Sequence, residues 1–160
     1  GKVCHKLAHN ILNSRQDAEE CVNDAYLGTW NAIPPQRPDP LLPFVCVLVR
    51  RYSIMRYRAN TAMKRNSSYD ACMEEIENCI AAPGRVEDHY EAKVLARTIE
   101  RFLDTLNREN RVIFMRRYWY SDSYAAIAAL TGLTEKNVSV RLARVRKQLR
   151  DYLMKQGVLT

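Results

Sequence analysis

Residues 122–152 limit the choice of folds more than any other part of the chain, because they predict two helices joined by a tight turn. Apolar residues from Tyr124 onward predict a short helix, which Gly132 interrupts because glycine is a poor helix former. Thr134 is a candidate N-cap for the second helix, with Asn137 where a complete capping box has Glu or Gln. Apolar residues then recur at three- and four-residue intervals, the period of one buried helical stripe: Val138, Leu142, Val145, Leu149 and Leu153.

The opposite face of this second helix is mostly polar or cationic. It carries Lys136, Asn137, Ser139, Val140, Arg144, Lys147 and Arg150. A short helix, a glycine turn and a longer basic helix are typical of a helix-turn-helix, because the major groove of DNA admits one helix whose outward side chains meet base edges and phosphates. An ordinary helical hairpin with a solvated basic face is the alternative that these residues alone leave open.

Composition favours an all-α protein. Apolar residues make up 47% of the 160 residues, only five residues are glycine, and no long stretch alternates apolar and polar residues as a sheet would. No apolar run approaches the ~18 residues of a membrane span, and the N-terminus has no signal-peptide pattern. The five cysteines are odd in number and lack a C-x-x-C pair, which favours reduced thiols in the cytoplasm over a disulfide framework or zinc site.

The net charge of +7 is distributed in alternating blocks along the chain. Residues 14–33 carry −3, residues 50–65 carry +6 with no acid, residues 70–91 carry −6, and residues 95–160 carry +7. Two basic blocks separated by an acidic one predict two modules that bind a polyanion, joined by a tether that repels it.

The first two predicted helices lie before the prolines at 34–43. In residues 3–13, His5 and His9 stand one helical turn apart, but without an HExxH pattern or a carboxylate partner we interpret them as ordinary histidines and predict no metal site.

The next helix runs from Ser14 or Asp17 to about residue 32. Its expected core face is Ala18, Cys21, Val22, Ala25, Tyr26, Thr29, Trp30 and Ile33. Its outer face, which carries Glu20, Asn23, Asp24 and Leu27, is either a protein-docking patch or a solvated surface.

A long third helix is expected from near Leu42. Its expected buried stripe is Phe44, Leu48, Tyr52, Met55, Ala59 and Ala62. The arginines that flank this stripe predict phosphate contacts. Tyr57 is either a stacking surface for unpaired bases or a further core residue.

These features predict two small helical domains joined by a flexible linker. The first domain is expected over residues 1–66, an acidic linker over residues 67–91 with one or two helical turns at Cys72–Ile76, and the second domain over residues 92–160. In the second domain, two further helices and the helix-turn-helix are expected to form a four-helix unit. The first of these two helices is expected to bury Val94, Leu95, Ile99, Phe102, Leu103 and Leu106. The second, over residues 107–118, has the apolar residues Val112, Ile113, Phe114 and Met115.

Taken together, the chain resembles the sigma-70 family of RNA polymerase initiation factors, in its small extracytoplasmic-function (ECF) type. Residues 17–27 followed by Trp30 are similar to the family's region 2.2 signature, D-A-E-D-x-x-Q-E-x-F-L followed by W. Residues 44–58 resemble regions 2.3 and 2.4, and residues 106–149, with R-x-R at Arg144 and Arg146, resemble region 4.

The resemblance implies a transcription initiation factor that binds bacterial core RNA polymerase and directs it to promoters, with no catalytic residue and no cofactor. The implied partner surfaces are the β′ clamp helices and the β flap of the polymerase, and an anti-sigma factor is a further candidate partner. The implied polymerase-binding residues are Asp17, Glu20, Asn23, Asp24 and Leu27. The acidic linker would thread the RNA-exit path of the polymerase.

The resemblance also implies two DNA-binding surfaces. One helps to melt the minus-10 element and holds its unpaired strand: Arg50, Arg51, Tyr52, Arg56, Tyr57, Arg58, Lys64 and Arg65. The other recognises the minus-35 element as duplex: Lys136, Asn137, Ser139, Val140, Arg141, Arg144 and Lys147.

The chain departs from the family pattern in three places. Arg50-Arg51 stands where many members have Arg-Asn, and Met55 stands where they often have Asp, so no minus-10 base preference carries over. Residues 136–141, KNVSVR, replace the usual Gly-Thr-Val-Lys-Ser-Arg, which keeps the scaffold and changes the reading side chains. The family has a further helical stretch before Gly1, so we expect N-terminal truncation.

Two other classes of protein compete with this interpretation. A stand-alone helix-turn-helix regulator would use only the second domain on DNA and would bind a specific duplex without polymerase. A nuclease-like enzyme is disfavoured because no Asp, Glu and His residues cluster at metal-ligand spacing.

Overall fold

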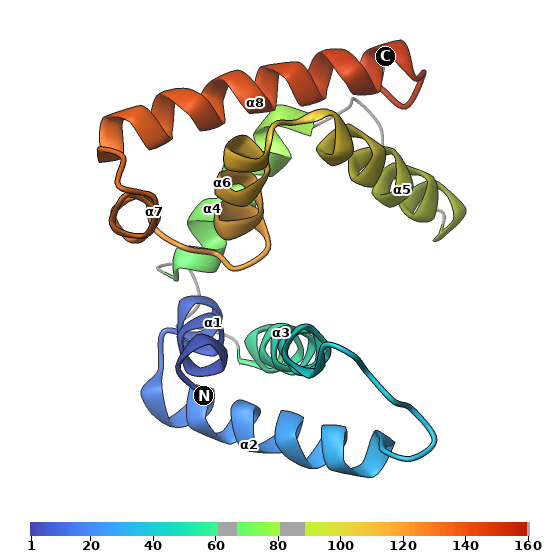
Figure 1. The fold of residues 1–160 in the computed structure, drawn as a ribbon, viewed down its shortest axis with the longest axis vertical. Coiled ribbons are helices and arrows are strands. Elements are labelled where there is room, and N and C mark those ends of the chain that lie inside the picture. Colours follow the sequence, from blue (N-terminus) through green and yellow to red (C-terminus); the bar gives the residue numbers. More distant parts are fainter. Residues whose placement is uncertain (61–66, 81–88, 160) are drawn as a thin grey trace. The chain divides into compact units, whose positions relative to one another are not determined.

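The computed structural model describes residues 1–60, 67–80 and 89–159. Helices dominate this part of the chain and no strand occurs within it, so the all-α prediction is confirmed. The chain divides into two compact units, Gly1–Cys72 with Tyr120–Asp122 and Met73–Trp119 with Ser123–Thr160 (Figure 1).

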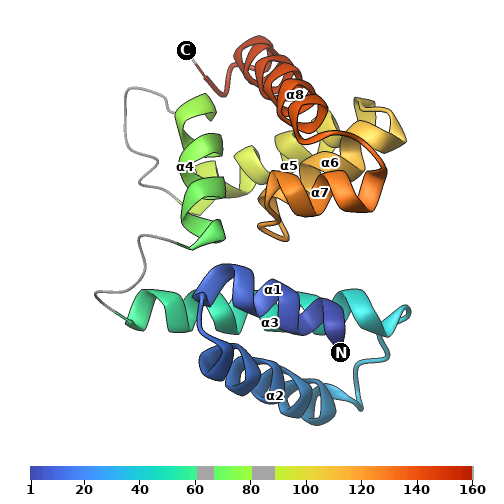
Figure 2. The same cartoon turned by 90° about the vertical axis from the view of Figure 1, so that its left-hand side faces the viewer.

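The first unit is built from three helices, α1 (Lys2–Leu12), α2 (Arg15–Ala32) and α3 (Leu41–Ala59), and each of them packs on the other two. Figure 1 shows α1 and α3 side by side, and in both Figures 1 and 2 α2 lies along the same face of the pair. The turn between α1 and α2 is short because both ends are capped. Asn13 takes a left-handed conformation (φ 50°) and its N–H bonds the His9 carbonyl at 2.8 Å, while Ser14 Oγ accepts the Asp17 N–H at 3.3 Å.

The buried stripe expected along α3 is wrong by about one residue. Met55 is 58% exposed and Ala59 is also exposed, while the buried residues of α3 are Val45, Cys46, Val49 and Ser53. The last residue of the expected stripe, Ala62, lies outside the described residues. The first turns of α3 are apolar on almost every side, so the helical period alone could not fix which face points inward. Of the residues expected in the core of α2, Tyr26 and Ile33 are each 40% exposed and Trp30 is 79% exposed, so the predicted core face is too wide.

The second unit is organised around its longest helix. Helix α8 (Glu135–Lys155) packs on α5 (His89–Thr105), α6 (Arg108–Tyr118) and α7 (Tyr124–Thr131). The predicted buried stripe of α8 is confirmed, because Val138, Leu142, Val145, Leu149 and Leu153 are all fully or almost fully buried. Near the C-terminal end of α8, the Tyr152 ring lies 5.6 Å from the ring of Phe102 on α5, centroid to centroid. The predicted burial of Val94 in the first part of α5 is wrong, because its side chain is 37% exposed.

Helix α4 (Ser68–Ile80) is longer than the one or two turns expected there. A reciprocal pair of hydrogen bonds starts it: the Asp70 N–H donates to Ser67 Oγ at 3.1 Å and the Ser67 N–H donates to Asp70 Oδ2 at 3.2 Å. This is a capping box, which satisfies two backbone donors that a helix start otherwise leaves open. The two units divide inside α4, after Cys72, while the boundaries expected from the sequence remain a prediction.

No helix in the described part of the chain is both long enough and apolar enough to cross a bilayer.

Candidate functional site

The turn between α7 and α8 is fixed at each end by its own sequence. Ser123 caps α7 by accepting the Ala126 N–H at 3.1 Å, and Gly132 ends it at φ 76° with its N–H bonded to the Ala128 carbonyl. Thr134 then caps α8 by accepting the Asn137 N–H at 3.1 Å, as predicted. A left-handed glycine followed two residues later by a new N-cap turns the chain sharply between the helices, which gives the geometry of a helix-turn-helix.

The outer face of α8 presents most of the residues predicted to bind the minus-35 element. Lys136, Asn137, Val140, Arg144 and Lys147 are exposed, and Ser139 is half-buried. Since the buried stripe holds the opposite side of the helix against α5, α6 and α7, the exposed side chains form one surface. Cations and an amide on one face of a recognition helix suit phosphate and base-edge contacts.

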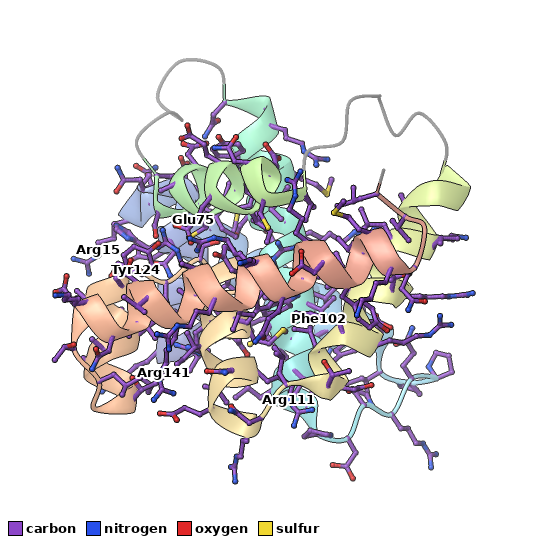
Figure 3. The ribbon with its side chains drawn as sticks, turned by 90° about the horizontal axis from the view of Figure 1, so that it is seen from above. Arg15, Glu75, Phe102, Arg111, Tyr124 and Arg141 are labelled. Atoms are coloured by element: carbon purple, nitrogen blue, oxygen red, sulfur yellow. The ribbon has the colours of Figure 1, made fainter. Side chains whose placement is uncertain are left out.

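Arg141 differs from the other predicted minus-35 residues because it has a partner inside the unit. Its Nη1 atom lies 2.7 Å from Glu109 Oε2, at the start of α6, and Figure 3 labels Arg141. Both side chains are partly exposed, so the ion pair contributes about 1 kcal/mol or less to stability.

Glu75 of α4 forms a partly buried cluster that the sequence did not predict. Its Oε2 atom accepts hydrogen bonds from Arg117 Nη2 at 2.9 Å and from the Tyr124 hydroxyl at 2.5 Å. Its Oε1 atom accepts from the Tyr118 hydroxyl and from Arg146 Nη1, both at 2.5 Å. The Arg117 guanidinium also stacks over the Tyr124 ring at 4.2 Å, and Figure 3 labels Glu75 and Tyr124.

The electrostatics of this cluster keep the carboxylate ionised. Burial alone would raise the pKa of Glu75, but the hydroxyls of Tyr118 and Tyr124 and the guanidinium of Arg117 stabilise its charge and lower that pKa below its ordinary value. Burial and the bond to Glu75 raise the pKa of both tyrosines, so their hydroxyls stay protonated and donate. Glu75 therefore ties α4 to α6, α7 and α8.

A second contact fastens the end of α4 to α8. Arg150 Nη1 donates to the Cys79 carbonyl at 3.1 Å, and the Cys79 thiol donates to the Arg146 carbonyl at 3.1 Å. Arg144 and Arg146 of the R-x-R pair consequently have different surroundings. Arg144 is exposed on the outer face, whereas Arg146 lies against α4.

In the first unit, the residues predicted to bind the minus-10 element vary in exposure. Arg51 and Arg58 are exposed, Arg50 is half-buried with its pKa lowered by burial, and Lys64 and Arg65 lie outside the described residues. Arg56 pairs with two acids of α2, its Nη1 lying 3.2 Å from Asp17 Oδ1 and its Nη2 3.1 Å from Glu20 Oε2.

The two tyrosines of this set contact neighbouring helices. The Tyr52 ring lies over Gly28 of α2, where a β-carbon would come within 2.7 Å of the hydroxyl oxygen. The Tyr57 hydroxyl donates to Asp70 Oδ1, and the Tyr57 ring meets that of Tyr69 edge to face at 5.1 Å. Tyr57 therefore packs on the first turn of α4.

The outer face of α2 combines acids with exposed apolar side chains. Glu20, Asn23, Asp24 and Leu27 are exposed, and Asp17 is half-buried through its contact with Arg56. Leu27 is 59% exposed and Trp30, one turn further along, is 79% exposed. The sequence prediction placed Trp30 in the core because Trp30 continues the apolar spacing of α2. The one sequence signal for its exposure is that it follows Leu27 of the outer face by about one helical turn.

Within the described residues, no group of three or more His, Cys, Asp or Glu side chains is arranged to hold a metal ion.

Comparison with known protein families agrees with this division of the chain. Residues 2–63 match the model of sigma-70 region 2, and residues 96–149 match the model of sigma-70 region 4. The first match falls in the first unit, and the second falls in the second unit except for Tyr120–Asp122 and contains the helix-turn-helix.

One curated relative is the ECF RNA polymerase sigma factor SigE of Mycolicibacterium smegmatis. The two chains are 22% identical over 153 residues, which cover 96% of the present chain. The present chain spans 58% of the length of that relative, less than two thirds.

Proposed function

Because this chain belongs to the sigma-70 family, in its extracytoplasmic-function type, we propose that it is a transcription initiation factor that binds bacterial core RNA polymerase and directs it to promoters. The observation that carries the proposal is the presence, on one chain, of a region 2 unit with an exposed acidic and apolar helix face and a region 4 unit with a cationic helix-turn-helix. The proposal gives the chain no catalytic residue and places it in the cytoplasm with the polymerase.

The outer face of α2 is the proposed handle for the polymerase. Exposed Leu27 and Trp30 beside the carboxylates of Glu20 and Asp24 suit a partner surface that is basic with an apolar centre, because an exposed aromatic side chain gains most when a partner excludes water from it. We assign this surface to the β′ clamp helices, and we assign the β flap to the region 4 unit.

The two DNA surfaces act on different forms of the promoter. The outer face of α8 binds the minus-35 element as duplex, and α3 with its arginines binds the minus-10 element as it opens. Unstacking a base costs a few kcal/mol, and a factor offsets that cost if it holds the exposed strand more tightly than the closed duplex. No catalytic group is needed for this step.

Reconstituted transcription tests the proposal directly. The purified chain is added to bacterial core RNA polymerase on a library of promoters, and transcripts are sequenced. We expect transcripts that depend on the added chain and decrease steeply with salt, because phosphate contacts release counterions. If none appears, including with a chain extended at its N-terminus, the proposed function is wrong.

A charge reversal tests the polymerase handle. Asp24→Arg is expected to lower core affinity at least tenfold while the helical circular dichroism is unchanged, because it places a cation in the proposed basic interface. Asp39→Arg is the matched control, since it makes the same charge reversal at an exposed position of the same unit that lies outside α2. Equal core affinity for the two variants would mean that this face is only solvated.

The alternative function, a stand-alone helix-turn-helix regulator, predicts the opposite dependence on polymerase. It requires tight, specific duplex binding by the chain alone. Arg144→Ala should weaken binding to the minus-35 element and leave core affinity intact in the sigma-factor proposal. Strong specific binding without polymerase, with no effect of core enzyme on it, would favour the regulator.

A further inference from the structure

We propose that Val140 recognises the C5-methyl group of a thymine in the minus-35 element, and so determines part of the sequence that this chain selects. The inference rests on the proposed function for its promoter context. It concerns a side chain whose own chemistry offers neither a hydrogen-bond donor nor an acceptor.

Val140 lies in the part of α8 that meets base edges when a recognition helix enters the major groove. Helix α8 starts at Glu135, and it is the N-terminal residues of such a helix that contact bases. The Val140 side chain is 40% exposed, and it is flanked one turn away on each side by exposed Lys136 and Arg144.

The packing of α8 does not account for a valine at this position. The buried stripe passes through Val138 and Leu142, both 0% exposed, and Val140 lies on the other side of the helix. Valine is also a weaker helix former than alanine at an exposed position, because its branched side chain loses rotamer freedom. Single exposed apolar residues are common on protein surfaces, but this one is placed among the cations of a DNA-facing surface.

The major groove contains one apolar feature that an aliphatic side chain can contact, the methyl group of thymine. Asn137 lies three residues before Val140 and is also exposed, so the two side chains are neighbours on the helix. A carboxamide matches the acceptor and donor that adenine presents in the same groove. An aliphatic group beside an amide therefore fits a site that contains an A·T pair.

The neighbouring polar side chains offer less competition for the same bases. Arg141 lies about 100° from Val140 around the helix axis and pairs with Glu109 at 2.7 Å, and Ser139 is half-buried. Arg144 and Lys147 are long cations nearer the middle of α8, where phosphates of the flanking strand are the expected contact. The apolar contact of Val140 is thus a separate source of sequence preference.

The test begins with selection. Holoenzyme reconstituted from the full chain and bacterial core polymerase selects active promoters from a library with a randomised minus-35 element. We expect wild-type chain to enrich thymine at one position at least, and Val140→Ser to lose the enrichment there while other positions keep theirs. No thymine preference in the wild type, or the same preference in Val140→Ser, overturns the inference.

A single-group change in the DNA then isolates the methyl group. The selected thymine is replaced by deoxyuridine, which lacks only the C5-methyl. Wild-type holoenzyme should lose about fourfold in promoter affinity, the equivalent of ~0.8 kcal/mol for one buried methylene-sized group. Val140→Ser should bind the two promoters equally, and Val140→Thr, which keeps one methyl group, should retain part of the discrimination.

Two matched variants separate this contact from general effects. Leu130→Ser changes another exposed apolar side chain, 59% exposed on α7, and should leave the thymine-to-deoxyuridine ratio at about four. Lys147→Ala should weaken both promoters equally, because a phosphate contact carries no base information. A ratio that falls to one in either control would overturn the assignment to Val140.

Failure of the proposed function gives a distinguishable result. If the chain supports no transcription with core polymerase, duplex DNA is selected with the full chain alone. Thymine enrichment that depends on Val140 would then support the contact without the sigma-factor role. Selection with no such enrichment would overturn the contact as well.

Discussion

Replacing Glu75 by glutamine should destabilise the second unit strongly, although the two side chains have nearly the same shape. Glu75 accepts four hydrogen bonds, two of them from the guanidiniums of Arg117 and Arg146. Glutamine keeps one acceptor oxygen and turns an amide donor toward groups that also donate. Breaking a fully buried ion pair costs about 3–5 kcal/mol, and the Glu75 and Arg146 side chains are 18% and 20% exposed, so we expect a loss of about 2 kcal/mol.

Urea unfolding followed by tryptophan fluorescence measures this loss. The chain has two tryptophans, Trp30 in the first unit and Trp119 in the second, so a Trp30→Phe background reports on the second unit alone. With a slope of roughly 1 kcal/mol per molar urea for a small unit, the midpoint should fall by about 2 M.

Glu74→Gln is the matched control for this experiment. Glu74 is exposed on the same helix, so its replacement removes the same charge and should change stability by less than about 0.5 kcal/mol. Equal midpoints for the Glu74 and Glu75 variants would refute the reasoning, because they would mean that the cluster contributes no more than a solvated carboxylate.

Because the pKa of Glu75 is lowered in the folded chain, its stabilising contribution is fully present above its ordinary pKa of 4.5 and declines as pH falls toward the folded value. The difference in unfolding free energy between wild type and Glu75→Gln should therefore narrow as pH falls below 4.5, and a difference that stays constant would contradict this. Thr134→Ala removes the N-cap of α8 and should cost the second unit about 1 kcal/mol in the same urea assay, while Thr134→Ser should cost little. Leu142→Ala should cost about 2–5 kcal/mol because Leu142 is 0% exposed, whereas Val140→Ala should cost less than about 0.5 kcal/mol; similar losses for the two would mean that the faces of α8 are assigned wrongly.

The second unit was the easier one to predict from its sequence. In α8 the apolar residues form a single stripe among polar ones, so the 3.6-residue period fixes both the helix and its buried face. Gly132 ends α7 in a left-handed conformation and Thr134 caps α8, and both effects depend only on residues nearby in the sequence. In α3 the apolar residues surround the helix, and the same rule chose the wrong face for Met55.

The Glu75 cluster shows a different limit of sequence reasoning. Glu75 is 42 residues from Arg117 and 71 residues from Arg146, so no local pattern relates them. An acidic residue in an acidic segment predicts solvent exposure and repulsion of polyanions, and only the tertiary structure supplies its cationic partners. The predicted polymerase-binding and DNA-binding residues lie on exposed or half-buried faces wherever the structure describes them, and their roles remain predictions.

The attachment of α4 determines where the chain can be cut into independently stable pieces. A fragment that starts at residue 92, where the sequence would place the domain boundary, contains Arg117, Tyr118, Tyr124 and Arg146 without the carboxylate that accepts from all four. A fragment that starts at Ser67 keeps that carboxylate together with the capping box that begins α4. Protease digestion should accordingly trim the second unit to a core that retains α4.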